Sequence, residues 1–185
     1  MISHDRACEL IGRLGAKASD PNKLPPGIAG LVPQDIAAAL AGSDRASYLM
    51  ALKKFALDDS RDNELKRLLW SMAVDLATRL HWYRNDKGPH LKGKLQAMVN
   101  LALAEQTQPW HCPHCRGAGI HQNQQLCKRC RGSGRAYLQH HERAQIIGID
   151  RRRWHESWRH RYQHIYAMIE GLPTDAVEGL RRGLS

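Results

Sequence analysis

Four of the five cysteines lie within 19 positions, in two pairs that share one spacing. The first pair reads C-P-H-C-R-G-A-G from Cys112, and the second reads C-K-R-C-R-G-S-G from Cys127. A turn between cysteines at this spacing brings both sulfurs to one side, so two such pairs can supply a tetrahedral shell of four thiolates. The pattern therefore predicts one structural zinc ion held by Cys112, Cys115, Cys127 and Cys130.

The residues around the pairs explain how such a site would form. The glycines that follow each pair can adopt positive φ, which lets backbone N–H groups turn towards the sulfurs and stabilise their charge. A segment this short and rich in glycine cannot build a hydrophobic core. We therefore expect it to be disordered without metal. Two alternatives stay open: His111, His114 or His121 replaces one cysteine ligand, or the four cysteines are free and buried.

Positive charge is concentrated in the half of the chain that carries these pairs. Of a formal net charge of +10, residues 110–185 hold 13 Lys/Arg against 6 Asp/Glu, whereas residues 1–109 hold 15 against 12. Every basic residue of the second half except Lys128 is arginine. Guanidinium groups pair with phosphates and with guanine edges, so this half is predicted to bind nucleic acid.

A helix-turn-helix is predicted directly after the cysteine pairs. Gly148 suits the turn, and Asp150 is a good N-cap for a long second helix. Aromatic and aliphatic side chains at spacings of three and four predict the buried face of that helix: Trp154, Trp158, Tyr162, Ile165 and Ile169. The candidate DNA contacts lie on its other faces, near its N-terminal end: Arg151, Arg152, Arg153, His155 and Arg159.

Three features of this segment leave other interpretations open. Arg143 stands where the first helix of such a motif usually has an apolar residue. The two tryptophans could stack on the bases of a single strand instead of packing in a core. The arginines could form a solvated face with no role in binding DNA.

The chain ahead of the cysteines shows helical periodicity, and its apolar stripes are typical of helix packing. Prolines and glycines in 19–33 indicate a linker, and a short helix is expected over 34–40, before one capped by Ser43. We therefore predict a mainly α protein with a helical N-terminal bundle. Its predicted parts are 1–32 (N-terminal helix and linker), 33–109 (helical region), 110–137 (zinc-binding module) and 138–185 (helix-turn-helix and C-terminal tail).

Several classes of protein are not expected. No window of 18 or more apolar residues occurs, and Met1–Lys17 lacks the apolar stretch of a signal peptide, so a cytoplasmic location without a membrane partner is predicted. An enzyme is not expected, because the thiolate shell leaves no open position and the sequence lacks catalytic triads, paired carboxylates and phosphate-cradling loops.

The order of these features resembles the late-gene antitermination proteins Q of lambdoid phages. The resemblance is clearest over 112–169 and extends to the helices from about Asp35 onward. The cysteine frame is also similar to that of the J-domain co-chaperones. Those carry four such repeats and a His-Pro-Asp tripeptide, whereas this chain has two repeats and no such tripeptide.

The resemblance implies a mechanism. Such a protein binds a double-stranded DNA element in a late promoter while bacterial RNA polymerase is paused nearby with its sigma factor. It then moves to the polymerase, near the flap and the RNA exit channel, and terminators no longer release the transcript. The four cysteines would be the zinc ligands, and Arg151 to Arg153, His155 and Arg159 would contact DNA. The alternatives are a conventional zinc-containing transcriptional regulator and a zinc interaction module of chaperone type.

Overall fold

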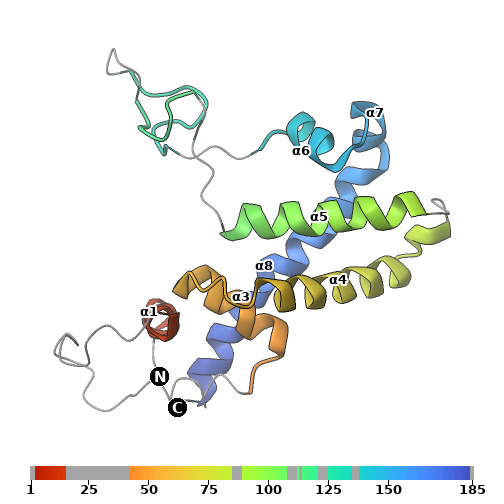
Figure 1. Cartoon of the computed structure of the whole chain (residues 1–185). Helices are drawn as coiled ribbons and strands as arrows, with labels where there is room; N and C mark the ends of the chain where they lie inside the picture. The colour runs from red at the N-terminus through yellow and green to blue at the C-terminus, as the bar shows by residue number, and fades with distance from the viewer. Residues whose placement is uncertain are drawn as a thin grey trace. The chain divides into compact units, whose positions relative to one another are not determined.

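The computed structural model describes residues 3–15, 42–84, 89–107, 112, 114–120, 125–134 and 138–183 (Figure 1). Within these residues the protein is mainly helical and has no β-strand, which confirms the prediction of a mainly α protein. An isolated antiparallel bridge joins Ile120 to Leu126. The predicted linker over 19–33 and the short helix over 34–40 lie outside the described residues.

Among the described residues, the helices in chain order are α1 (His4–Gly15), α3 (Arg45–Ala56), α4 (Asp62–Arg79), the 3-10 helix η2 (Trp82–Arg84), α5 (Pro89–Thr107), α6 (His140–Ile147), α7 (Arg151–Arg153), the π-helical turn η3 (Trp154–Trp158) and α8 (Arg159–Gly183). None of the described helices combines the length and the apolar character that crossing a bilayer requires.

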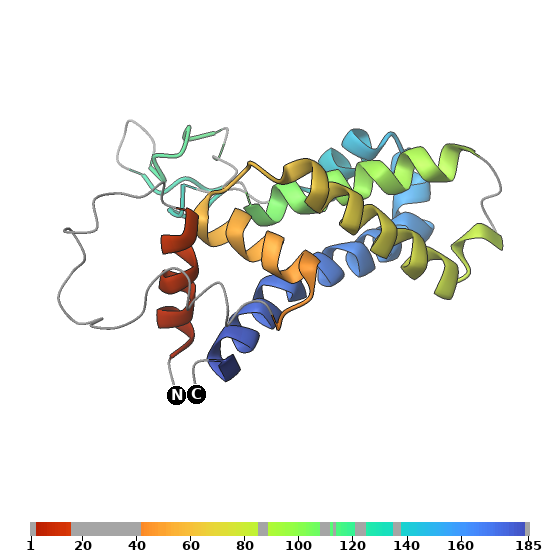
Figure 2. The same ribbon diagram turned by 60° about the horizontal axis from the view of Figure 1, so that its bottom comes forward.

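The chain divides into two compact units, Met1–Leu76 with Ala167–Ser185, and Ala77–Tyr166. In the first unit, α1 packs beside α3 (Figure 2). Their apolar faces and the last turns of α8 share one core, formed by Ala7, Leu10, Ile11, Ala51, Leu52, Ala176, Val177 and Leu180. The helix predicted at the start of the chain therefore packs its apolar side chains into this core.

The start of α3 differs from the prediction in one residue. Asp44, and not Ser43, is the N-cap: its carboxylate accepts hydrogen bonds from the backbone N–H groups of Ala46 and Ser47, at 3.0 and 3.1 Å. Both residue types suit this position, and a sequence pattern fixes a helix boundary only to within a residue or two. The side chain of Ser43 instead lies against Gly179 of α8.

The apolar stripe predicted over 65–80 is buried only in part, because Leu68, Met72 and Leu76 of α4 are half-buried. Leu65, Leu69 and Ala73 are buried, as the spacing of three and four predicts. Leu80 is 41% exposed because the helix ends at Arg79, so the last buried position of the stripe falls on Ala77.

In the second unit, α6 lies beside α5 (Figure 1). Gly148 ends α6 in the left-handed conformation (φ 74°), and the Asp150 carboxylate caps the next helix by accepting from the backbone N–H of Arg153. The helix then continues through α7, η3 and α8, with one π-type hydrogen bond from Arg159 N–H to the Trp154 carbonyl. Gly148 therefore ends one helix and Asp150 caps the next, at the two positions where the sequence predicted a turn and an N-cap.

Candidate metal centre and nucleic-acid interface

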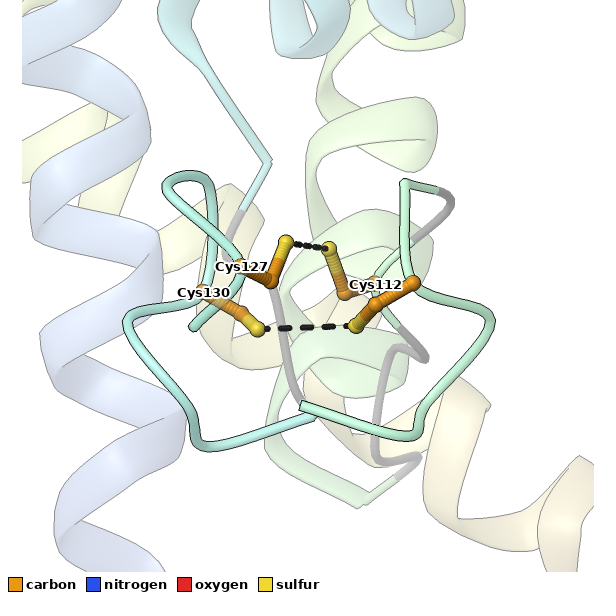
Figure 3. Close-up of side chains that lie close together, drawn as sticks. Cys112, Cys127 and Cys130 are labelled. Carbon is orange, nitrogen blue, oxygen red and sulfur yellow. Dashed lines mark hydrogen bonds between the residues drawn. The ribbon is translucent and has the colours of Figure 1, made fainter. Parts of the chain in front are cut away.

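The four cysteine sulfurs of the two pairs face one another between two loops of the second unit (Figure 3). Cys112 Sγ lies 3.7 Å from Cys127 Sγ, and Cys115 Sγ lies 3.6 Å from Cys130 Sγ. All four sulfurs lie within 4.8 Å of one another, and all four residues are buried. The structure therefore brings together every cysteine that the spacing had singled out.

This geometry fits a metal ion and not a pair of disulfides. A disulfide holds its sulfurs about 2 Å apart, which is far shorter than the separations seen here. A tetrahedral shell with metal–sulfur bonds of about 2.3 Å has sulfur–sulfur edges of about 3.8 Å, close to the separations of 3.7 and 3.6 Å in the two cysteine pairs above. The cluster could hold a metal ion. His114 is exposed and outside the cluster, while His111 and His121 lie outside the described residues.

The two cysteine loops are joined by a matching pair of backbone hydrogen bonds. Cys127 N–H donates to the Gly119 carbonyl and Cys112 N–H donates to the Gly134 carbonyl, both at 2.9 Å. Each loop thus holds the first cysteine of the other through its last glycine. The Gly119 N–H also donates to Cys115 Sγ at 3.2 Å, which is the contact expected of a backbone N–H turned towards a thiolate.

Two glycines are required here by close backbone approach as well as by positive φ. A Cβ on Gly119 (φ 77°) would lie 2.3 Å from the Gly132 carbonyl oxygen. A Cβ on Gly134 (φ 68°) would lie 2.2 Å from the Gly117 carbonyl oxygen. The sequence pattern predicted the positive φ but gave no sign of the crossing between the loops, since that depends on how the repeats pair in space.

The thiols of the cluster differ in acidity. Burial raises the pKa of Cys115 to about 11. At Cys130 burial opposes the thiolate, but hydrogen bonds from the Cys115 thiol and from the Gly134 N–H outweigh it and lower the pKa. A bound divalent cation would replace the shared protons and neutralise the charge of the thiolates.

A salt bridge ties the second cysteine loop to the start of α6. Arg129, between Cys127 and Cys130, donates from Nη2 to Glu142 Oε1 at 2.7 Å. The other oxygen of Glu142 accepts from the Gln139 N–H, also at 2.7 Å, which closes a capping box at the start of α6. The two side chains are only 20% and 26% exposed, so the contact is largely shielded from water. The loop that holds two cysteines therefore also fixes the first turn of α6.

The candidate DNA contacts lie together at the start of the following helix. Arg151, Arg152, Arg153 and His155 are exposed, and Arg159 is half-buried. Arg152 Nε forms an exposed ion pair with Glu156 at 2.7 Å, a contact of little energetic value at such exposure. The predicted arrangement, cationic side chains on the outer faces of this helix, is present.

Trp154 and Trp158 form the inner face of the same helix. They are 0% and 1% exposed. The interpretation in which the two rings stack on single-stranded bases is therefore wrong, because neither ring is accessible to a base. Lys94 and Arg161 lie over the Trp158 ring, at 4.9 and 4.6 Å from its centroid, and add cation–π contacts to the packing.

The carboxylate of Glu105 on α5 holds the two helices of the turn in place. It accepts from Arg143 Nε of α6 at 3.0 Å and from Tyr162 OH of α8 at 2.5 Å. Burial and this carboxylate raise the pKa of Tyr162, so its hydroxyl stays protonated and donates. The partner explains why Arg143 is tolerated where an apolar residue was expected. Sequence reasoning missed Glu105, because 38 residues separate it from Arg143 and no local pattern connects them.

The chain matches no protein-family model and no curated protein.

Proposed function

We propose that this protein is a zinc-stabilised transcription factor that binds double-stranded DNA through α6 and the helix beginning at Arg151, and that it acts as an antitermination factor. The single observation that carries the proposal of DNA binding is the cluster of Arg151, Arg152 and Arg153 with His155, exposed on a helix whose inner face is fixed by Trp154 and Trp158.

Zinc is the proposed occupant of the cysteine cluster. Four sulfurs within 4.8 Å of one another suit zinc or an iron–sulfur centre, and the two C-x-x-C turns suit a single ion. With four protein ligands the ion has no open position for a substrate, so its proposed role is structural. Through Arg129 and Glu142 it would hold the first turn of α6 in place.

Double-stranded DNA is the proposed partner because cations cluster on the outer face of this helix while its large aromatic rings are buried. The N-terminal end of the second helix of a helix-turn-helix contacts base edges in the major groove. Arginine gives bidentate contacts to guanine there. A binder of single strands would instead need accessible aromatic side chains, and Trp154 and Trp158 are not accessible.

Antitermination is proposed from the resemblance to the Q proteins. On that proposal the protein binds an element in a promoter, meets RNA polymerase paused with its sigma factor, and is carried forward near the flap and the RNA exit channel. The nearly balanced charge of residues 1–109, 15 Lys/Arg against 12 Asp/Glu, suits contact with another protein better than contact with DNA. We assign the docking of the polymerase to this part of the chain.

Replacing Arg152 or Arg153 by alanine is expected to weaken binding to the preferred duplex by about 1–3 kcal/mol, because each side chain would lose a base-edge contact. The preferred duplex is first selected from a random double-stranded pool with zinc-loaded wild-type protein. Affinities are then measured for that duplex and for a scrambled one. Arg67→Ala, an exposed arginine of α4, is the matched control and should leave both affinities unchanged.

The selection itself tests the proposal. Zinc-loaded protein that enriches no sequence, and that binds no duplex at low salt, would contradict it. Equal losses on both duplexes for Arg152→Ala and Arg153→Ala would assign these two side chains to the DNA backbone instead.

A further inference from the structure

A hollow of about 360 Å³ lies between the beginning of α6 and the helix that starts at Arg151. Two arginines and three histidines line it, namely Arg143, Arg151, His140, His141 and His155. No carboxylate is among the described residues of its lining. Such a concentration of cationic and hydrogen-bond-donating groups is typical of a site for an anion.

Two carboxylates close to residues of this lining already accept hydrogen bonds, and one of them pairs with Arg143 of the lining itself. Glu142 accepts from Arg129 and from the Gln139 N–H, and Glu105 accepts from Arg143 and Tyr162. Within the part of the chain that the structure describes, the Arg151 side chain has no ion-pair partner. The positive charge of the hollow is therefore only partly neutralised by the protein.

His140 shows the electrostatic consequence inside the hollow. Burial lowers its pKa, and the positive charges of Arg159, Arg143 and His155 lower it further. Its Nδ1 is buried and has no hydrogen-bond partner among the described residues. Positive groups thus act on a His140 ring that itself lines the hollow.

We propose that this hollow seats a phosphodiester group of the DNA backbone, held by Arg151 and His155 from one helix and by His140 and His141 from the start of α6. The proposal rests on the DNA-binding function proposed above and deepens it. Positions 151 and 155 share one face of their helix, as residues four apart do, and both line the hollow. Arg152 and Arg153 do not line the hollow, so we assign them to contacts with base edges. Arg151 and His155 would fix the position of the duplex through its backbone.

Salt dependence separates the two kinds of contact. Each phosphate contact adds about 0.9 to the slope of log affinity against log salt. Arg151→Ala should therefore reduce the affinity for the selected and the scrambled duplex by the same factor. Its loss of affinity between about 50 mM and about 200 mM NaCl should be about three- to fourfold smaller than that of the wild type. His155→Ala should reduce both affinities equally, and Arg67→Ala should change neither the affinities nor the slope.

Replacing single phosphates of the duplex by uncharged methylphosphonates identifies the phosphate that the hollow binds. Each modified duplex carries one such replacement, and its affinity is measured for the wild type and for Arg151→Ala. One position should weaken wild-type binding and leave the binding of Arg151→Ala unchanged, because the variant has already lost that contact. Two measurements guard against misfolding of the variant: its zinc content and its thermal unfolding should equal those of the wild type, since Arg151 is exposed.

The outcomes distinguish this proposal from the function on which it rests. If Arg151→Ala keeps the wild-type salt slope and loses preference for the selected duplex, Arg151 contacts bases and the phosphate site is wrong, while DNA binding stands. If every methylphosphonate weakens the variant as much as the wild type, the site is also wrong. If the wild type binds no duplex, both proposals fail. Saturable binding of inorganic phosphate or ATP at micromolar concentration, without DNA, would reassign the hollow to a small anion.

Discussion

Cys127→Ser is expected to lose both the bound metal and the binding of DNA. Wild-type protein purified without chelator should contain about one zinc ion per chain, and the variant should contain none. A serine hydroxyl does not replace a thiolate at this site, and the three remaining sulfurs cannot complete the shell. Elemental analysis of the purified proteins, with duplex affinity measured on the same samples, checks the prediction.

The loss of DNA binding follows from the contacts between the loop and α6. Arg129 occupies the same turn as Cys127 and donates to Glu142, which closes the capping box at the start of α6. When the loop loses its metal, that salt bridge loses its support. The Glu142→Gln variant should therefore retain zinc while its affinity for duplex DNA falls, because the substitution removes only the salt bridge between Arg129 and Glu142.

Cys8→Ser is the matched control for the metal prediction. Cys8 lies half-buried on α1, in the other compact unit, and it should keep both zinc and DNA binding when replaced. Wild-type protein without stoichiometric metal would contradict the assignment of zinc. A Cys127→Ser variant that retains one zinc ion per chain would show that the ion is bound elsewhere.

Trp154→Ala is expected to destabilise the protein by about 3–5 kcal/mol. The side chain is fully buried, and its ring packs against Tyr162, with 5.7 Å between the ring centroids. Truncation would leave a large cavity under the helix that carries the arginines. Chemical denaturation of the zinc-loaded protein measures the loss.

Trp154→Phe separates packing from hydrogen bonding at the same position. The indole N–H of Trp154 is buried without a hydrogen-bond partner among the described residues, so phenylalanine removes an unsatisfied donor and keeps most of the ring. Its cost should be well below that of alanine. If Trp154→Ala left the free energy of unfolding unchanged and reduced DNA affinity alone, the ring would be a contact residue and not part of the core.

The local features of the site could be predicted because each depends on residues close together in the sequence. The C-x-x-C frames predicted which four sulfurs meet, and Gly148 with Asp150 predicted where one helix ends and the next begins. The spacing of Trp154, Trp158 and Tyr162 predicted the buried face, because helical periodicity alone decides which side chains share a side.

The long-range contacts could not be predicted in this way. Glu105, the buried acceptor for Arg143 and Tyr162, carries no motif and lies on a different helix. The hollow depends on how the start of α6 approaches the helix of Arg151 and His155, which is a matter of tertiary packing. At Leu80 the periodicity continued beyond the end of the helix, and the structure places that side chain at the surface.

The central claim is tested most directly by transcription through a terminator in a purified system. The template carries the selected duplex beside the promoter, and a matched template carries the scrambled one. Zinc-loaded protein should raise the fraction of transcripts that pass the terminator only on the first template, and polymerase halted beyond the element should still carry the protein. Unchanged release at the terminator, with the protein bound to its element and absent from the halted polymerase, would contradict antitermination and identify a conventional regulator.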